Sequence, residues 1–263
     1  MAYSVAICLI GVVSALGVCA RFVKFGYSGT ISPDKWGELS PDYFLCSNGT
    51  RQSPINIVGA TAVVDRSLKQ LERDYNPANA TLVDNGFNVM LKYGDEVGVM
   101  VIDGKNYTLE QMHWHSPSEH TIDGVRYPTE MHLVHFSADG NISVVAVLYK
   151  YGHADPFLYQ LKEEMYQMSR EVNGGKYNAT VTAGLVETKA LRRHTNKYYR
   201  YMGSLSTPPC TENVIWNVLG KVREISREQA ASLSLLLEED YRNNSRPTQL
   251  LNGRRVLLYH EGV

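Results

Sequence analysis

The chain has 263 residues, with 26 lysines and arginines against 27 aspartates and glutamates, 8 histidines and 4 cysteines. Its length suits one large or two small domains, and such a chain can bury about 70–75% of its unfolded surface. The net charge of −1, with no basic stripe, argues against a nucleic-acid partner. The 44% hydrophobic and 20% charged residues exclude global disorder and collagen-like or coiled-coil architectures.

The first twenty residues have the features of a cleaved signal peptide. Residues 1–20 contain no charged side chain, and Val5–Val18 is an apolar run too short to span a bilayer comfortably. Small residues end this segment, so we expect cleavage after Ala20 and a mature domain over residues 21–263. No lysine or arginine precedes the apolar run, which leaves an uncleaved anchor or a buried strand as the alternative.

Two further patterns agree with export. Cys8 and Cys19 would leave with the signal peptide, and the remaining Cys46 and Cys210 suggest one disulfide, with two free buried thiols as the alternative. Six asparagines fit the glycosylation acceptor pattern: Asn48, Asn79, Asn106, Asn141, Asn178 and Asn243. The end of the chain has neither an apolar tail nor a retention signal, so we expect no membrane anchor in the mature chain.

Past Ala20 no linker or repeat indicates a second domain, and short β-rich runs alternate with turn signals. The expected strands are Thr81–Tyr93, Val97–Ile102, Thr108–His115, Glu130–Ser137, Ile142–Tyr151, Val214–Val222 and Arg255–His260. Asp139-Gly140-Asn141 predicts a hairpin turn between two of them. Helices are few: Asp155-Pro156 begins one through about Met168, and Ser226 with Gln229 forms a capping box before Ala230–Glu239.

Five of the eight histidines fall between positions 113 and 135. His113 and His115 are two apart on an expected strand and therefore share one face, as does Gln111, which can accept a hydrogen bond from His113. His132 shares a face with Glu130, and an antiparallel neighbour would place it opposite the first pair. Three converging imidazoles make a catalytic zinc site with an open fourth position. Satisfied histidines of an ordinary sheet or surface patch are the alternative.

A second segment, Ser204–Cys210, places the hydroxyls of Ser206 and Thr207 just before two prolines. Proline fixes φ, so this loop presents its hydroxyls in a set direction. Taken alone, the segment is more typical of an ordinary polar turn.

These motifs together resemble the α-class carbonic anhydrases, in order and through nearly the whole mature chain. The resemblance rests on Gln111–His120, Glu130–Phe136 and Gly203–Trp216, and on Gly26-Tyr27, Trp36-Gly37, Gln52–Ile57 and Arg246-Pro247. Ser116–His120 and Asp155–Phe157 are most similar to the plant branch. The family's fold is a large twisted, mostly antiparallel sheet of about ten strands with short peripheral helices. Cys46 and Cys210 fall where secreted members of the family place their single disulfide.

The resemblance implies a role for each site residue. His113, His115 and His132 match the Zn²⁺ ligands, and Gln111 and Glu130 match the groups that orient two of them. The third such contact, from His115, would fall on backbone near Asn244. Glu119 and Ser206 match the pair that orients zinc-bound hydroxide, with Thr207 as the neighbouring hydroxyl. The apolar wall for carbon dioxide matches Val134, Val144, Leu205, Val214 and Trp216, whereas Met112 and His135 match no role and are interpreted as packing.

Two positions depart from the family pattern. Ser206 stands where threonine is usual; serine keeps the hydroxyl but loses the methyl group that restricts χ1. Phe87 follows Asn85-Gly86, where fast members have a histidine that shuttles protons. Phenylalanine cannot titrate, so we expect slow proton export that depends on external buffer.

The sequence therefore predicts a zinc lyase that hydrates carbon dioxide reversibly to bicarbonate and a proton. The alternative is a binding, storage or interaction protein on the same fold with little or no turnover. The expected partners are carbon dioxide and bicarbonate, and nothing indicates a protein partner. We expect passage through the secretory pathway to the cell wall or apoplast, with the chloroplast as the alternative.

Overall fold

The computed structural model describes residues 23–94, 97–176, 178–192 and 195–262. The predicted signal peptide with Cys8 and Cys19 lies outside these residues, as does His194. No helix in the described ranges is both long and apolar enough to cross a bilayer.

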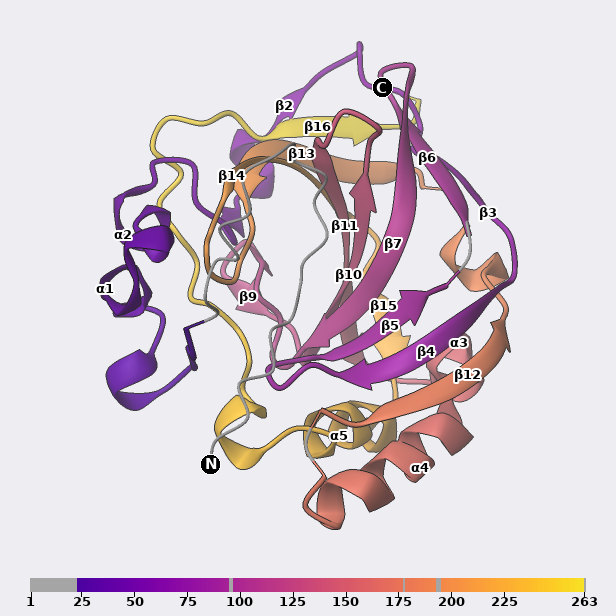
Figure 1. The fold of residues 1–263 in the computed structure, drawn as a ribbon. Helices are drawn as coiled ribbons and strands as arrows, with labels where there is room; N and C mark the ends of the chain where they lie inside the picture. The colour runs from indigo at the N-terminus through magenta and orange to yellow at the C-terminus, as the bar shows by residue number, and fades with distance from the viewer. Residues whose placement is uncertain (1–22, 95–96, 177, 193–194, 263) are drawn as a thin grey trace.

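A mixed sheet of thirteen strands forms the centre of the described chain (Figure 1). The expected large, mostly antiparallel sheet is confirmed, and its main path runs through ten strands. In path order they are β12 (Thr180–Val186), β4 (Ala78–Asp84), β5 (Val89–Tyr93), β7 (Lys105–His115), β10 (Thr129–Phe136), β11 (Ile142–Tyr151), β14 (Glu212–Leu219), β13 (Lys197–Ser204), β16 (Leu257–His260) and β2 (Val63–Val64).

Three more strands extend this sheet, and a small second sheet lies beside it. β3 (Glu72–Tyr75) pairs with β6 (Gly98–Ile102), β6 pairs with β7, and β15 (Arg223–Ile225) pairs with β11. The second sheet holds β1 (Asn56–Ile57), β8 (Thr121–Ile122) and β9 (Val125–Arg126). Short 3-10 helices connect elements at Gly29–Ile31, Pro41–Tyr43, Gly59–Thr61, Lys189–Leu191 and Glu239–Tyr241.

The central strands bury both faces of the sheet. Along β11, Val145 and Val147 join one apolar cluster, while Val144 and Ala146 join another. Successive side chains of a strand point to opposite faces, so these clusters lie on opposite sides of the sheet. Helices α4 (Lys162–Asn173) and α5 (Arg227–Leu235) contribute to the first cluster. The second cluster lies on the face that carries the predicted site.

The run Thr81–Tyr93 is two strands, not the single strand that we expected. β4 ends at Asp84, and β5 begins at Val89 and pairs back antiparallel with it. Between them, Oδ1 of Asn85 accepts hydrogen bonds from the backbone N–H groups of Phe87 (3.2 Å) and Asn88 (2.8 Å). Asparagine closes turns in this way, so Phe87 lies in a hairpin turn.

The expected helix from Asp155 to about Met168 is also divided. The Asp155 carboxylate caps α3 (Pro156–Tyr159) by accepting from the N–H groups of Phe157 and Leu158. The side-chain amide of Gln160 exchanges hydrogen bonds with the backbone of Glu187 at 2.8 and 3.0 Å. This contact between distant segments holds the chain where the first helix ends, and α4 begins two residues later at Lys162.

The Ser226–Gln229 capping box is confirmed, with both reciprocal hydrogen bonds present. The helix that it begins, α5, ends at Leu235 and not near Glu239 as expected. Leu236 and Leu237 both turn into the apolar core, which takes the chain out of the helical path. Two other short helices, α1 (Trp36–Leu39) and α2 (Leu45–Asn48), lie beside the site face (Figure 1).

His135 packs in the interior, as expected, and it does so on the face opposite the predicted site. It is fully buried, and Nε2 contacts the Tyr75 hydroxyl at 2.5 Å while Nδ1 contacts the Ser143 carbonyl oxygen at 3.2 Å. Burial lowers the pKa of His135 to about 3. This histidine is therefore neutral in the folded protein at any moderate pH.

The buried His135 predicts acid-sensitive stability. An unfolded histidine titrates near pH 6.5, so below about pH 6.5 the unfolded chain binds a proton that the folded chain excludes. The free energy of unfolding should fall by up to about 1.4 kcal/mol per pH unit from this group, down to about pH 3. Urea unfolding at several pH values should show a shallower decline in His135→Gln than in wild type. An equal decline in both proteins would contradict this assignment.

Candidate metal centre

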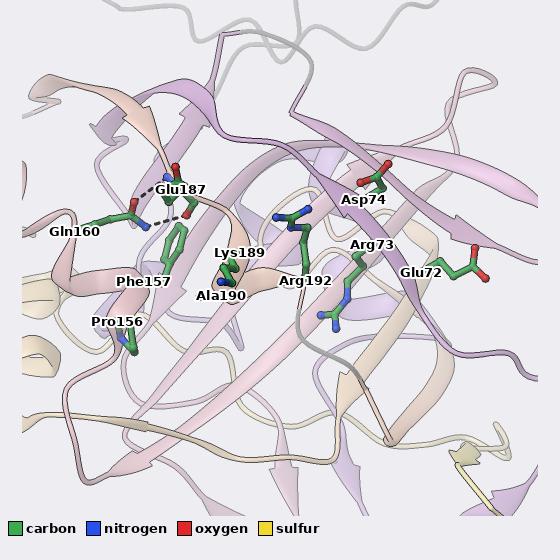
Figure 2. A pocket seen from close by; sticks show the side chains of 10 residues that line it. All are labelled: Glu72, Arg73, Asp74, Pro156, Phe157, Gln160, Glu187, Lys189, Ala190 and Arg192. Atoms are coloured by element: carbon green, nitrogen blue, oxygen red, sulfur yellow. Dashed lines mark hydrogen bonds between the residues drawn. The ribbon is translucent and has the colours of Figure 1, made fainter.

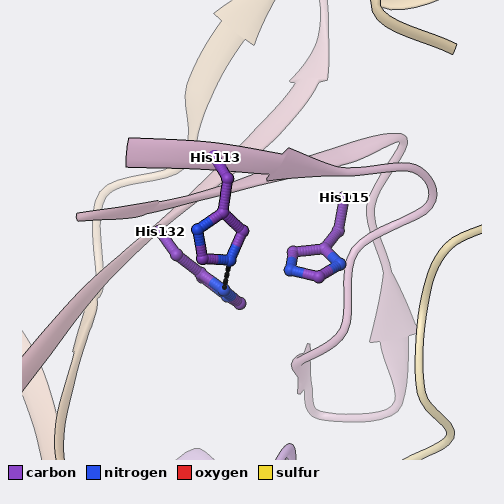
Figure 3. Close-up of side chains that lie close together, drawn as sticks. All are labelled: His113, His115 and His132. Atoms are coloured by element: carbon purple, nitrogen blue, oxygen red, sulfur yellow. Dashed lines mark hydrogen bonds between the residues drawn. The ribbon is translucent and has the colours of Figure 1, made fainter. Parts of the chain in front are cut away.

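Three histidines converge on one point at the centre of the sheet (Figure 3). His113 and His115 project from the same face of β7, and His132 on β10 pairs directly with His113. The ring centroids lie 4.6 to 5.1 Å apart, and one nitrogen from each ring lies within 4.8 Å of the others. The predicted convergence of the three imidazoles is confirmed.

The second nitrogen of each ring meets an acceptor, which determines the tautomer. His113 Nδ1 lies 2.9 Å from Oε1 of Gln111, and His132 Nε2 lies 2.7 Å from Oε1 of Glu130, as expected. His115 Nδ1 lies 2.7 Å from the backbone carbonyl oxygen of Asn244. Each of these nitrogens must carry the proton, which leaves lone pairs on the other three.

These lone pairs suit a metal ion. His113 Nε2 and His132 Nδ1 face each other at 3.3 Å. Neither nitrogen carries a hydrogen, because the proton of each ring is on its other nitrogen, bound to Gln111 or Glu130. Nε2 of His115 is buried and has no hydrogen-bond partner within the described ranges. Lone pairs at this distance repel each other unless a cation accepts them. Three imidazole nitrogens with an open fourth position are the donor set of catalytic Zn²⁺, so the residues fit this ion.

Electrostatics keep the site in the protonation state that a metal needs. Burial, reinforced by the neighbouring imidazoles, lowers the pKa of His113 well below its usual value, and burial also lowers the pKa of His115. Burial alone would raise the pKa of Glu130, but His120 and His132 outweigh it and hold this pKa well below the usual range. Neutral imidazoles at His113 and His115 and an ionised Glu130 carboxylate favour metal binding.

His120 is a buried histidine whose role the sequence did not indicate. It contacts the Glu130 carboxylate and helps to hold it in place. His120 Nδ1 lies 2.6 Å from Glu130 Oε1, and its Nε2 lies 2.7 Å from the Tyr201 hydroxyl. Glu130 Oε2 also accepts from the backbone N–H groups of Glu119 and His120. The sequence offered one signal for a role of His120, its place at the end of the Ser116–His120 motif. Its partner Tyr201 could not be predicted, because it lies 81 residues away.

The residues predicted to hold carbon dioxide lie together. All five belong to one apolar cluster or pack against it: Val134, Val144, Leu205, Val214 and Trp216. Their adjacency follows from the strand register, which pairs Val144 with both Val134 and Trp216. The Trp216 ring lies 4.8 Å from that of His132, so this apolar wall reaches the metal centre.

Ser206 lies on the loop between β13 and β14 (residues 205–211, the hydroxyl loop) and is only 6% exposed, whereas Thr207 beside it is partly exposed. The Glu119 carboxylate is fully buried. The N–H of Cys210 donates to the carbonyl oxygen of Thr207, which closes the loop. Oε1 of Glu119 accepts from the backbone N–H of Arg246 at 3.0 Å, and Oε2 has no partner in the described part of the chain. Among the described residues neither oxygen of Glu119 accepts a hydrogen bond from Ser206, so this contact stays a prediction.

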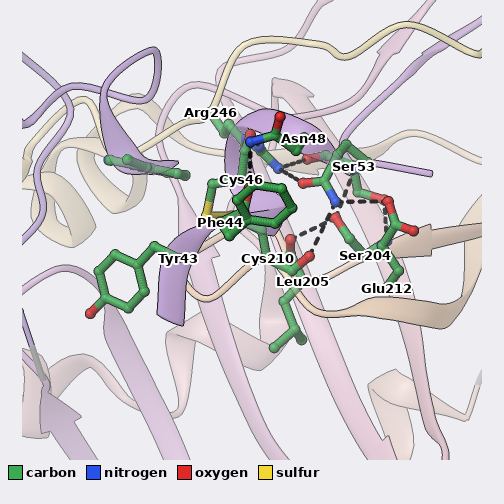
Figure 4. Close-up of a disulfide and its surroundings, with 12 residues drawn as sticks. Tyr43, Phe44, Cys46, Asn48, Ser53, Ser204, Leu205, Cys210, Glu212 and Arg246 are labelled. Carbon is green, nitrogen blue, oxygen red and sulfur yellow. Dashed lines mark hydrogen bonds between the residues drawn. A yellow bond between two sulfur atoms is a disulfide. The ribbon is translucent and has the colours of Figure 1, made fainter. Parts of the chain in front are cut away.

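A disulfide joins Cys46 and Cys210, as the sequence suggested (Figure 4). It connects α2 to the end of the hydroxyl loop across a sequence separation of 164 residues. Cross-linking segments so far apart restricts the unfolded chain and anchors the loop that carries Ser206.

Phe87 occupies the position where the resemblance places a proton-shuttling histidine. Its ring packs against Phe25 with centroids 5.0 Å apart, and it is partly buried against the cluster that contains the disulfide. Its carbonyl oxygen accepts from Nδ2 of Asn244, the residue whose carbonyl oxygen holds His115. The turn therefore borders the metal centre while presenting a side chain that cannot carry a proton.

The structure exposes every predicted glycosylation acceptor: Asn48, Asn79, Asn106, Asn141, Asn178 and Asn243. Exposure is necessary for a modified site on the folded surface. Modification itself stays a prediction.

A separate cavity of about 920 Å³ opens elsewhere on the molecule, beside β3 and α3 (Figure 2). It is lined by Glu72, Arg73, Asp74, Pro156, Phe157, Gln160, Glu187, Lys189, Ala190 and Arg192. No predicted site residue lines it, and its three acidic and three basic side chains balance in charge. This cavity therefore gives no indication of a function, and the three-histidine site is the candidate functional site.

The fold and the site define a class of protein in which a large mixed sheet presents three convergent histidines, able to hold a metal ion, beside an apolar wall. A family model of eukaryotic-type carbonic anhydrase matches residues 31–260. The chain belongs to this family of α-class carbonic anhydrases.

Similar proteins include enzymes named as carbonic anhydrases and proteins with other names. Alpha carbonic anhydrase 7 of Arabidopsis thaliana is 43% identical, over 86% of this chain and 81% of its own. Dioscorin DB3L of Dioscorea polystachya is 37% identical, over 86% of this chain and 82% of its own. Among solved structures, dioscorin complexed with ascorbate has a TM-score of 0.86 at 35% identity, covering 90% of this chain and 98% of its own. The α-carbonic anhydrase of Thermovibrio ammonificans, in complex with the inhibitor sulfanilamide, has a TM-score of 0.79 at 38% identity, covering 90% of this chain and 99% of its own.

Proposed function

We propose that this protein is a zinc-dependent carbonic anhydrase that interconverts carbon dioxide and bicarbonate. The observation that carries the proposal is the convergence of three imidazole nitrogens whose opposite nitrogens are each held by an acceptor. His113, His115 and His132 would hold the ion. Zn²⁺ bound there would supply a hydroxide nucleophile near neutral pH, because it lowers the pKa of water from 15.7 to about 7.

The side chains around the centre would orient the reactants. Gln111, Glu130 and the Asn244 carbonyl fix the three rings, so no reorganisation is needed during turnover. Ser206 would accept a hydrogen bond from the nucleophile and donate its own proton to Glu119, which aims a lone pair at the substrate carbon. Carbon dioxide carries no charge to steer it, so the apolar wall beside His132 suits it.

Stopped-flow hydration of carbon dioxide by the zinc-loaded mature protein tests this function. We expect a rate that climbs steadily with buffer concentration, because Phe87 offers no internal route for the proton. Bound zinc without hydration at any buffer concentration would instead favour a binding protein on this fold. The similarity to dioscorin complexed with ascorbate makes that alternative specific, and ascorbate binding can be measured on the same sample.

Replacing Ser206 by threonine should improve the orientation of the hydroxyl. The added methyl restricts χ1, and selecting one of three staggered wells is worth at most about 0.6 kcal/mol, which corresponds to a rise of up to about threefold in rate. We therefore expect a rise in kcat/KM for carbon dioxide hydration within that range. An unchanged kcat/KM would show that the methyl group has no importance here.

We also propose that the chain passes through the secretory pathway to the cell wall or apoplast. The exposed acceptor asparagines and the disulfide support this location. Mass spectrometry of the protein from its native tissue would test it: a new N-terminus after Ala20 and attached glycans are expected. A mature protein with neither feature, recovered from chloroplasts, would contradict it.

A further inference from the structure

Arg246 places a charged side chain in the interior beside the Cys46–Cys210 disulfide (Figure 4). It is 1% exposed, and its guanidinium group lies 5.5 Å from the centroid of the Trp36 ring. Nη1 donates to Oε1 of Gln52 and to the carbonyl oxygen of Ser53, and Nη2 donates to the carbonyl oxygen of Cys46, each at 2.8 Å. These fixed acceptors leave the planar guanidinium one orientation.

Gln52 extends this contact to the hydroxyl loop. Its Oε1 accepts from Arg246, while Nε2 donates to the carbonyl oxygen of Cys210 at 3.1 Å and to Glu212 at 3.0 Å. Cys210 closes the loop that contains Ser206. One amide side chain thus connects the guanidinium group to the loop.

Arg246 also contacts the other half of the predicted hydroxyl–carboxylate pair. Its backbone N–H donates to Glu119 Oε1 at 3.0 Å, and the same oxygen lies 3.6 Å from Nδ1 of His115. Glu119 is fully buried, and its second oxygen is the one without a partner in the described residues. The residue that holds this carboxylate is therefore connected through Gln52 to the Ser206 loop.

We propose that Arg246 and Gln52 are positioning residues that set the geometry between the Glu119 carboxylate and the Ser206 hydroxyl. The inference rests on the proposed function and deepens it, because it names the residues that align Ser206, the hydroxyl that would accept a hydrogen bond from the nucleophile. Such groups must be held within about 0.5 Å and 10–20° of the productive geometry. Displacing either end of the pair would reduce reactivity without removing a metal ligand.

The experiment compares Arg246→Lys with Arg200→Lys. Lysine retains the charge but cannot contact all three acceptors of the guanidinium group. Arg200 is a matched control: it is also buried, lies 5.4 Å from the Tyr198 ring, and bonds to Asn217 without contacting the site. Thermal unfolding of both variants reports the general cost of replacing a buried arginine.

Two inhibitory probes separate orientation from metal binding. Sulfanilamide carries an N–H that can donate to Ser206 only when that hydroxyl in turn donates to Glu119, whereas thiocyanate has no hydrogen to donate. Both dissociation constants are measured on the cobalt-loaded protein from its visible absorption, together with the metal affinity. We expect Arg246→Lys to weaken sulfanilamide about tenfold to a hundredfold, while thiocyanate and metal affinities stay within about twofold.

The kinetic readout follows the same logic. kcat/KM for hydration should fall in Arg246→Lys by a factor similar to that for sulfanilamide, and Arg200→Lys should match wild type in both. Gln52→Glu keeps an oxygen acceptor for Arg246 but replaces the N–H donor with a carboxylate oxygen, which is repelled by the Cys210 carbonyl and the Glu212 carboxylate. It should show the same selective loss of sulfanilamide affinity. This second variant serves if Arg246→Lys fails to fold.

The outcomes distinguish this proposal from the proposed function. Equal loss of sulfanilamide and thiocyanate binding, or a loss no larger than in Arg200→Lys, would overturn the positioning role. If wild type binds both probes but does not hydrate carbon dioxide, the enzymatic function fails, and the probe ratio still decides the role of Arg246. If wild type retains no metal, both proposals fail.

Discussion

Replacing His132 by alanine should abolish zinc retention and carbon dioxide hydration together. Two imidazoles would remain, and Glu130 would be left buried with one hydrogen-bond partner fewer. Without the ion, the pKa of water returns from about 7 to 15.7, which lowers the hydroxide fraction at pH 7 by about eight orders of magnitude. We expect about one zinc per chain in wild type and almost none in the variant, measured by atomic absorption after gel filtration.

His135→Gln is the matched control, because His135 lies three residues further along β10 and points to the opposite face. It should retain zinc and turnover while losing about 1–3 kcal/mol of stability through its altered buried contacts. Hydration at the wild-type rate by a folded His132→Ala protein would refute the metal centre. Loss of zinc from both variants would show that general destabilisation, and not the missing ligand, explains the result.

Replacing Phe87 by histidine should raise the turnover at low buffer concentration. A histidine titrates near neutral pH, and a positioned general acid–base group contributes about 10²–10⁴-fold to a limiting proton transfer. The turn that holds residue 87 is tied to Asn244, whose carbonyl oxygen contacts His115, so the backbone that carries the new imidazole lies close to a predicted metal ligand. Turnover measured by stopped flow should lose most of its dependence on external buffer.

Tyr166→His controls for the mere addition of an imidazole. Tyr166 is 63% exposed on α4, the helix that packs on the side of the sheet away from the site. This variant should keep the buffer dependence of wild type. If Phe87→His gains no turnover at low buffer, slow proton export does not arise from Phe87. In that case, the low-turnover alternative gains support.

Features that depend on spacing along a single strand or turn were predictable from the sequence. A strand places residues two apart on one face, so His113, His115 and Gln111 could be placed together without any knowledge of the tertiary structure. The helix caps at Asp155 and Ser226 follow from hydrogen bonds that span two or three residues. The family resemblance added the roles of Glu119 and Ser206; the structure shows both side chains buried and, within the residues it describes, no hydrogen bond between them.

Boundaries were less predictable because they depend on contacts between distant segments. The helix expected from Asp155 is divided where Gln160 contacts the backbone of Glu187, 27 residues away. The run Thr81–Tyr93 folds back at Asn85, whose side chain closes the turn. Neither feature changes the hydrophobic pattern that predicted the elements.

The sequence by itself therefore determined the class of fold, the pattern of three histidines on neighbouring strands, and the presence of Phe87 where the family resemblance places a histidine. Only the tertiary structure decided what surrounds the site: the Tyr201 hydroxyl on His120 lies 81 residues away, and Arg246 reaches Cys46 across 200 residues. The physical reason is the range of the forces involved. Backbone geometry sets which neighbours share a face, whereas closure of the sheet and burial of unpaired polar groups select partners from the whole chain.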